Sequence, residues 1–186
     1  KPFTTMGMLY DPSQQSSVQR VEEMEKLSRT MRYKLVALPL GLDKDGKPDA
    51  ATIAPLVKEL AARKVEFVYF GFSSFLVQQS KLFTASAVEN KLPVFSGGQV
   101  PVTEGDALIA FYTGLYQIGA LAGTQVDKIL ENPRAPLDTL PIARLKRFSM
   151  TINMDAAHKL EMYPPISMVR IAEFIKVNQA PRRTGS

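Results

Sequence analysis

Short apolar runs alternate with longer amphipathic segments along most of the 186-residue chain, and this alternation limits the fold more than any other feature of the sequence. The runs have the β-branched and aromatic composition of buried strands. The segments between them repeat apolar residues every three or four positions, as helices do. The predicted strands cover 5–10, 34–40, 66–70, 93–95, 107–112 and 148–152, and the main predicted helices cover about 18–31, 53–63, 73–90, 115–131 and 154–160.

Strands separated by helices of this length predict right-handed crossovers and therefore a mainly parallel sheet. The strands are nearly all apolar, which is typical of a sheet covered by helices on both faces. The predicted fold class is thus α/β, with three layers. Val68 and Val94 should lie at the centre of the sheet and be almost fully buried.

Residues 1–162 form the predicted α/β domain, and the sequence changes character after it. Pro164-Pro165 precede one more amphipathic stretch, with Ile166, Val169, Ala172 and Ile175 as its apolar residues, so a closing helix is predicted within 163–177. Residues 178–186 are polar, basic and rich in Pro and Gly, and we expect them to be disordered.

Several function classes find little support in the composition. No apolar run reaches the 18 residues of a membrane span, and cysteine is absent, which removes thiolate chemistry and cysteine zinc sites. His158 is the single histidine and cannot form a multi-histidine metal site. The net charge of +5 lacks the clustered basic and aromatic residues of a nucleic-acid interface. No enzyme activity, metal, cofactor or nucleic-acid partner is predicted.

One glycine-rich loop has the spacing of a phosphate-binding loop. It runs from Gly41 to Lys47, but Pro48 stands where the magnesium-binding hydroxyl belongs. Asp43 and Asp45 would also repel phosphate. We interpret the loop as a solvated turn.

The strand ends carry the residues that matter most for function. In open α/β sheets, ligands bind beyond the carboxyl ends of the strands. Helices that begin at Ser16 and Ser73 would point free amides toward a ligand there. Without an evident acid–base pair, these groups suit binding better than catalysis, although the same composition also suits loops that merely cap helices. The predicted ligand-binding residues are Ser13, Ser16, Phe72, Ser73, Ser74, Gly97, Gly98, Gln99 and Tyr112.

The order and spacing of several motifs resemble ABC transporter substrate-binding proteins, of the type that includes tryptophan- and tyrosine-binding members. The resemblance runs from about Met6 to Ile175. The motifs that carry it are Met8-Leu9-Tyr10-Asp11-Pro12-Ser13 with Ser16, Glu66-Phe67-Val68-Tyr69, Leu92-Pro93-Val94-Phe95, Gly105, Tyr116-Gln117-Ile118-Gly119, Leu140-Pro141, and Ile152-Asn153 with Ala156.

The resemblance implies the second, C-terminal lobe of a two-lobed protein with the type I periplasmic-binding-protein fold. Such a protein captures a small solute, an amino acid or another organic molecule, in the cleft between its lobes and delivers it to an ABC permease. The implied location is periplasmic, or lipid-anchored outside the cytoplasmic membrane. In this chain Gly97-Gly98-Gln99 stand where family members often have an acidic residue, which would suit a ligand amine.

A ligand-sensing regulatory domain of the same fold is the first alternative function, and an α/β enzyme is the second. The N-terminal lobe is not recognisable in this chain. If the helix over 115–131 or the segment over 166–175 packs on that lobe, its apolar face lacks a partner here, and we expect the chain to self-associate.

Overall fold

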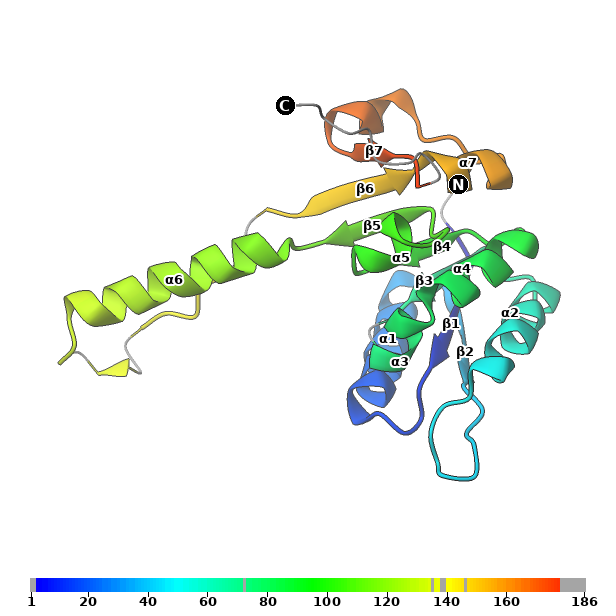
Figure 1. The fold of residues 1–186 in the computed structure, drawn as a ribbon, viewed down its shortest axis with the longest axis horizontal. Helices are drawn as coiled ribbons and strands as arrows, with labels where there is room; N and C mark the ends of the chain where they lie inside the picture. The colour runs from blue at the N-terminus through cyan, green and yellow to red at the C-terminus, as the bar shows by residue number, and fades with distance from the viewer. Residues whose placement is uncertain (1–2, 72, 135, 138–139, 146, 178–186) are drawn as a thin grey trace, which may run out of the picture.

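A seven-stranded sheet forms the middle layer of the computed structural model, which describes residues 3–71, 73–134, 136–137, 140–145 and 147–177 (Figure 1). The strand order is β2-β1-β3-β4-β5-β6-β7. All neighbouring strands run parallel except β5 and β6, which pair antiparallel. The predicted α/β class and mainly parallel sheet are confirmed. The strands are β1 Thr5–Tyr10, β2 Lys34–Pro39, β3 Phe67–Phe70, β4 Val94–Ser96, β5 Ile109–Tyr112, β6 Ser149–Asn153 and β7 Glu173–Ile175.

Helices cover both faces of the sheet. Successive strand residues point to opposite faces, and the ring of Phe70 meets Phe83 of α4 edge-on at 5.1 Å between centroids. On the other face, Gly71 lies beside the Arg20 side chain of α1. The helices are α1 Gln15–Met31, α2 Ile53–Ala62, α3 Ser74–Gln78, α4 Ser80–Glu89, α5 Val100–Thr103, α6 Leu115–Glu131 and α7 Met154–Leu160, with short 3-10 helices η1 Ala50–Thr52 and η3 Ile166–Arg170.

The core lies between the central strands and the face that α2 and α4 cover. Val68 and Val94 are paired in register on β3 and β4, and both are essentially fully buried, as predicted. Phe83, Ile53 and Leu60 pack over them from the helices. Burying such side chains contributes about 1.5–3 kcal/mol each.

The C-terminal segment differs from the predicted closing helix. The 3-10 helix η3 is followed, after Ile171 and Ala172, by strand β7. This strand pairs with β6 through Glu173 opposite Thr151 and Phe174 opposite Ile152. The three-residue apolar spacing fits a 3-10 helix as well as an α-helix, and strand pairing with β6 takes over after Arg170. The tail over 178–186, which was predicted to be disordered, lies outside the described residues.

Two further differences concern helices. The predicted helix over 73–90 is divided into α3 and α4 at Gln79, which has ψ 17°. The short helix α5 was not predicted, because Val100, Val102 and Thr103 are β-branched and have weak helix propensity.

Helix α6 projects beyond the sheet, and the chain returns along it toward β6 (Figure 1). None of its residues is buried. The returning chain contacts one side of the helix, where Gln125 donates a hydrogen bond from its Nε2 to the carbonyl of Pro141 at 3.1 Å. The remaining apolar side chains, including Leu115, Val126 and Leu130, stay exposed.

Candidate ligand-binding site at the strand ends

A hollow of about 600 Å³ lies at the carboxyl ends of β3, β4 and β5. Parallel strands end at the same edge, so their following loops meet there. The antiparallel strand β6 contributes from its amino end instead, which brings Phe148 to the same place. The lining residues are Phe70, Gly71, Val77, Ser96, Gly97, Gly98, Gln99, Val100, Pro101, Phe111, Tyr112, Thr113, Leu115, Ile118 and Phe148.

The floor of this main hollow is a tight turn after β4. Ser96 is fully buried, and its hydroxyl donates to the carbonyl of Gly98 at 2.8 Å while it accepts from the Gly98 N–H at 3.0 Å. The serine hydroxyl is therefore used within the protein. Gln99 is exposed at the rim, where its amide is available to a ligand.

Aromatic side chains form much of the wall. Phe111 and Phe148 stack at 5.1 Å between centroids with a 26° interplanar angle, and both are about half exposed. Tyr112 approaches Thr151 through its hydroxyl at 3.2 Å. Stacked rings of this kind offer a flat apolar surface to a ligand.

A smaller, more polar hollow adjoins the first, and Val77 lines both. Its other lining residues are Gln14, Ser16, Arg20, Ser73, Ser74 and Gln78. Gln14 connects its two sides, because its Oε1 accepts from the Ser74 N–H at 3.3 Å and its Nε2 donates to Ser16 Oγ at 3.0 Å.

The structure places seven of the nine sequence-predicted residues at one edge of the sheet, divided between the two hollows. Gly97, Gly98, Gln99 and Tyr112 line the main hollow, while Ser16, Ser73 and Ser74 line the adjoining one. Ser13 lines neither, since it turns back so that its N–H and hydroxyl both donate to Asp11 Oδ1. Phe72 lies outside the described residues.

Of the two predicted helix caps, the structure has the one at Ser73 and lacks the one at Ser16. Ser73 caps α3, with its hydroxyl accepting from the Leu76 N–H at 3.4 Å. Helix α1 begins at Gln15, two residues earlier than a cap at Ser16 would allow, and Gln14 makes no side-chain cap. The buried Ser17 instead accepts from the Asp11 N–H through its hydroxyl.

Sequence reasoning missed several residues of the two hollows, most of them from outside the parallel strand ends. Phe148 was overlooked because the antiparallel direction of β6 has no local sequence signal. Phe111 lies on β5, directly before the predicted Tyr112. Arg20 lies more than one turn into α1, where an arginine reads as ordinary helix surface. Leu115 and Ile118 reach the main hollow from the first turn of α6.

Apolar side chains dominate the lining of the main hollow, with a few polar groups among them. Among the described residues, no group of three or more His, Cys, Asp or Glu side chains could hold a metal ion. None of the described helices is long and apolar enough to cross a membrane. An apolar hollow with a few convergent polar groups at the carboxyl edge of a sheet is typical of α/β ligand-binding lobes.

The comparison with known protein families agrees with that class. Residues 2–174 match the family described as ABC transporter substrate binding protein, and the chain belongs to this family. A search of curated proteins finds no match.

Solved structures of similar fold cover nearly all of this chain. A substrate binding protein with adhesive properties from Clostridium difficile, in its ligand-free, open form, has a TM-score of 0.79 at 20% identity, covering 95% of this chain and 55% of that one. A conserved domain protein from Vibrio cholerae has a TM-score of 0.72 at 22% identity, covering 94% of this chain and 55% of that one.

An ABC domain from Streptococcus pneumonia, solved in complex with L-Trp, has a TM-score of 0.69 at 20% identity. The alignment covers 93% of this chain and 57% of that one. The chain therefore spans between 55% and 57% of the length of these three proteins.

Proposed function

We propose that this chain is one lobe of an extracytoplasmic solute-binding protein, the capture component of an ABC importer, and that it binds a small organic solute without catalysis. The observation that carries the proposal is the main hollow, which is large enough for a small ligand and lies where open α/β sheets bind them. Its open side would be closed by a second lobe, as in a two-lobed cleft.

Two observations support a missing second lobe. The similar solved structures are nearly twice as long as the aligned region of this chain. Helix α6 also extends away from the sheet with Leu115, Val126 and Leu130 exposed, which suits a helix that packs against another domain. Two further points belong to the same proposal: a permease partner, and a location in the periplasm or at a lipid anchor outside the cytoplasmic membrane. Membership of the family supports both.

Chemical-shift mapping by NMR tests this function on the chain as it stands. A panel of small organic solutes should shift the amide signals of Gly97 and Gly98 more than those of the opposite edge of the sheet. Because one wall of the cleft is absent, a ligand stays half solvated, so we expect affinities no tighter than roughly 1 mM, or about −4 kcal/mol.

A matched pair of variants makes the test specific to the main hollow. Phe148→Ala removes an exposed ring that lines it, and Tyr163→Ala removes a similarly exposed ring elsewhere on the surface. Binding should weaken in the first variant and persist in the second. A panel whose members shift no strand-end amide would contradict the proposed function.

A further inference from the structure

Arg20 stands at the junction of the two hollows. It lines the smaller hollow, and its Cγ lies 3.9 Å from the position that a Cβ on Gly71 would occupy, while Gly71 lines the main hollow. The guanidinium belongs to the second turn of α1, a 17-residue helix whose N-terminal end has no side-chain cap and no acidic residue in its first turn. The first turn of α1 therefore contributes no carboxylate.

Carboxylates are missing from the walls of both hollows. Among the described lining residues, Arg20 is the sole formally charged side chain. The strand-end carboxylate of Asp11 lines a third hollow, which shares Gln14, Ser74 and Gln78 with the smaller one. Its Oδ1 already accepts from the N–H and the hydroxyl of Ser13. An ammonium group in the two adjoining hollows would thus meet the like charge of Arg20 and no carboxylate among the lining residues, because Glu23, the ion-pair partner of Arg20, lines neither hollow.

The main hollow supplies the complementary part of a site. Phe111 and Phe148 present stacked rings, and Val77 lines both this hollow and the smaller one that Arg20 lines. Neutral polar groups at the turn after β4, including the Gln99 amide, can bind uncharged polar atoms. A ligand that fits both hollows has a planar apolar body in the first and an acid group in the second.

Resting on the proposed function, we infer that the site selects an organic acid with a planar apolar body, and not a zwitterionic amino acid or an amine. Arg20 is the anion-binding residue. A guanidinium binds a carboxylate through two parallel N–H donors, which fixes the orientation of the acid as well as its position.

Glu23 restrains Arg20 in the absence of ligand. Its Oε2 lies 2.6 Å from Arg20 Nη1, one turn along the exposed side of α1. A ligand carboxylate must compete with this internal partner. Removing the Glu23 charge should therefore strengthen acid binding, whereas removing the Arg20 charge should weaken it.

Four probes with the same phenyl ring separate the possibilities: phenylacetate, phenethylamine, phenylalanine and benzyl alcohol. They differ in carrying an acid, an amine, both, or neither. We expect phenylacetate to bind most tightly to the 186-residue chain in an NMR titration, shifting Gly97, Gly98 and the Nε–H of Arg20. Arg20→Gln should lower its affinity about fivefold and leave benzyl alcohol unchanged.

Two companion variants exclude a general effect on the fold. Glu23→Gln should raise phenylacetate affinity, because it frees the guanidinium, and a destabilised protein would not bind more tightly. Arg29→Gln removes an equal charge from an exposed position on the same helix and should change nothing.

The outcomes distinguish this inference from the function on which it rests. If phenethylamine or phenylalanine binds more tightly than phenylacetate, or if Arg20→Gln leaves acid binding intact, the inference is wrong although the hollow still binds solutes. If no probe shifts the strand-end amides, both the inference and the proposed function are contradicted.

Discussion

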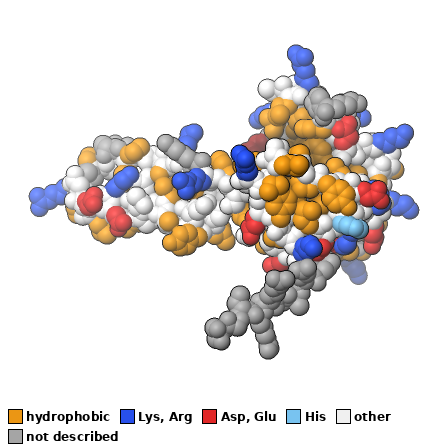
Figure 2. Space-filling view, turned by 90° about the horizontal axis from the view of Figure 1, so that it is seen from above, with side chains coloured by type: hydrophobic (Ala, Val, Ile, Leu, Met, Phe, Trp, Pro, Cys, Tyr) orange, Lys and Arg blue, Asp and Glu red, His pale blue; other side chains and the backbone are white. Residues whose placement is uncertain are grey.

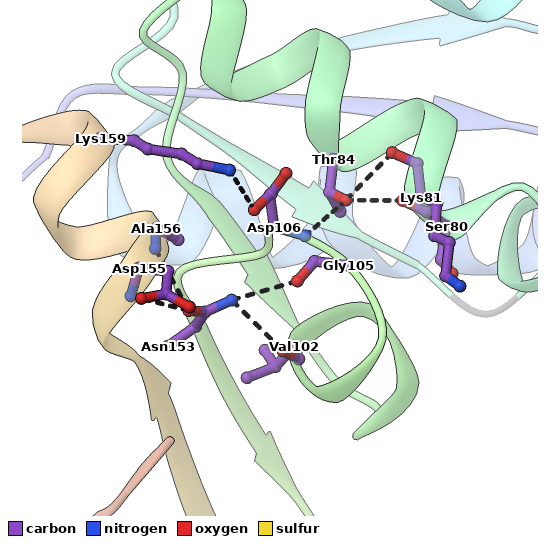
Figure 3. A network of polar contacts seen from close by, with 10 residues as sticks. All are labelled: Ser80, Lys81, Thr84, Val102, Gly105, Asp106, Asn153, Asp155, Ala156 and Lys159. Atoms are coloured by element: carbon purple, nitrogen blue, oxygen red, sulfur yellow. Dashed lines mark hydrogen bonds and ion pairs between the residues drawn. The ribbon is translucent and has the colours of Figure 1, made fainter. Parts of the chain in front are cut away.

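Asn153 connects the end of β6 to the rest of the fold through a single side chain. It is fully buried, and its Oδ1 accepts from the N–H groups of Asp155 and Ala156, which caps α7 (Figure 3). Its Nδ2 donates to the carbonyl of Gly105 at 3.1 Å and to that of Val102 at 3.4 Å. The strand that returns from α6 is thereby held to the loop that precedes β5.

Replacing Asn153 with Ala should be strongly destabilising. The change leaves two buried carbonyls and two helix-end amides without their partner, and we expect it to lower the free energy of unfolding by about 2–4 kcal/mol. Urea denaturation followed by circular dichroism measures this. Asn132→Ala is the control, since Asn132 is exposed after α6, and it should cost less than about 0.5 kcal/mol.

The burial of the Tyr69 phenol should affect how the stability of the protein changes at alkaline pH. Burial raises the pKa of its phenol above 10.0, with Arg20 opposing and Glu23 adding to that shift. The unfolded chain loses this proton near pH 10, whereas the folded protein keeps it to higher pH. The contribution of Tyr69 to stability is therefore complete below about pH 10 and is lost as pH rises through the folded-state pKa.

Tyr69→Phe removes this titration and should make the loss of stability between about pH 9 and pH 11 shallower. Urea denaturation at a series of pH values shows the difference, and Tyr163→Phe, at an exposed ring, serves for comparison. A decline just as steep in Tyr69→Phe would mean that the phenol is solvated in the folded protein.

Single residues at the site were predictable only where a local rule fixed them. Ser73 follows an apolar strand and precedes a helical period, and it caps α3 as expected. Ser16 fits the same rule, yet α1 begins at Gln15, and the Gln14 side chain bonds to Ser16 and to the N–H of Ser74. The contact with Ser74 involves the first residue of α3, 60 residues away, and has no signal in the local sequence.

At the scale of elements, strand positions followed from composition because a strand buried on both faces must be apolar. The observed ends of β1 match the prediction, and those of β3 and β4 differ from it by one residue. The direction of β6 and the strand character of Glu173–Ile175 did not follow, since both are decided by which neighbour the segment meets. The apolar spacing over 166–175 fits a single helix as well as a 3-10 helix followed by a strand, so it could not distinguish between them.

A charge buried in a central strand should prevent the protein from folding. Val94 is 1% exposed between β3 and β5, so Val94→Asp would place an unpaired carboxylate in the core at a cost of several kcal/mol. We expect no cooperative thermal transition by circular dichroism. Val126→Asp makes the same chemical change at an exposed position of α6, and the sheet should fold normally. A folded Val94→Asp protein would show that β4 is not central.

Apolar side chains remain exposed on the surface of the molecule, both along α6 and on the part that holds the sheet. Figure 2 shows hydrophobic side chains on the arm formed by α6 and its returning chain, among charged ones, and a broader hydrophobic area on the compact part. Along α6, Gly119 and Gly123 have no neighbouring atoms within 4 Å of an added Cβ, so one side of the helix is open to close approach. Monomeric proteins rarely leave such surfaces exposed.

We therefore expect the 186-residue chain to self-associate at micromolar concentration, with the exposed apolar side of α6 at the contact. Leu115, Val126 and Leu130 are each more than half exposed, and removing their apolar area from water is favourable at about 25 cal/mol per Å². Light scattering should show a mass above that of a monomer.

The double variant Val126→Glu with Leu130→Glu introduces two carboxylates on this side and should restore a monomer with an unchanged thermal transition. Ala120→Glu with Thr124→Glu adds the same charge to the other side of α6 and should leave association intact. A monomeric wild-type chain would show that α6 tolerates exposure, and dissociation by both double variants alike would place the contact elsewhere or attribute it to net charge.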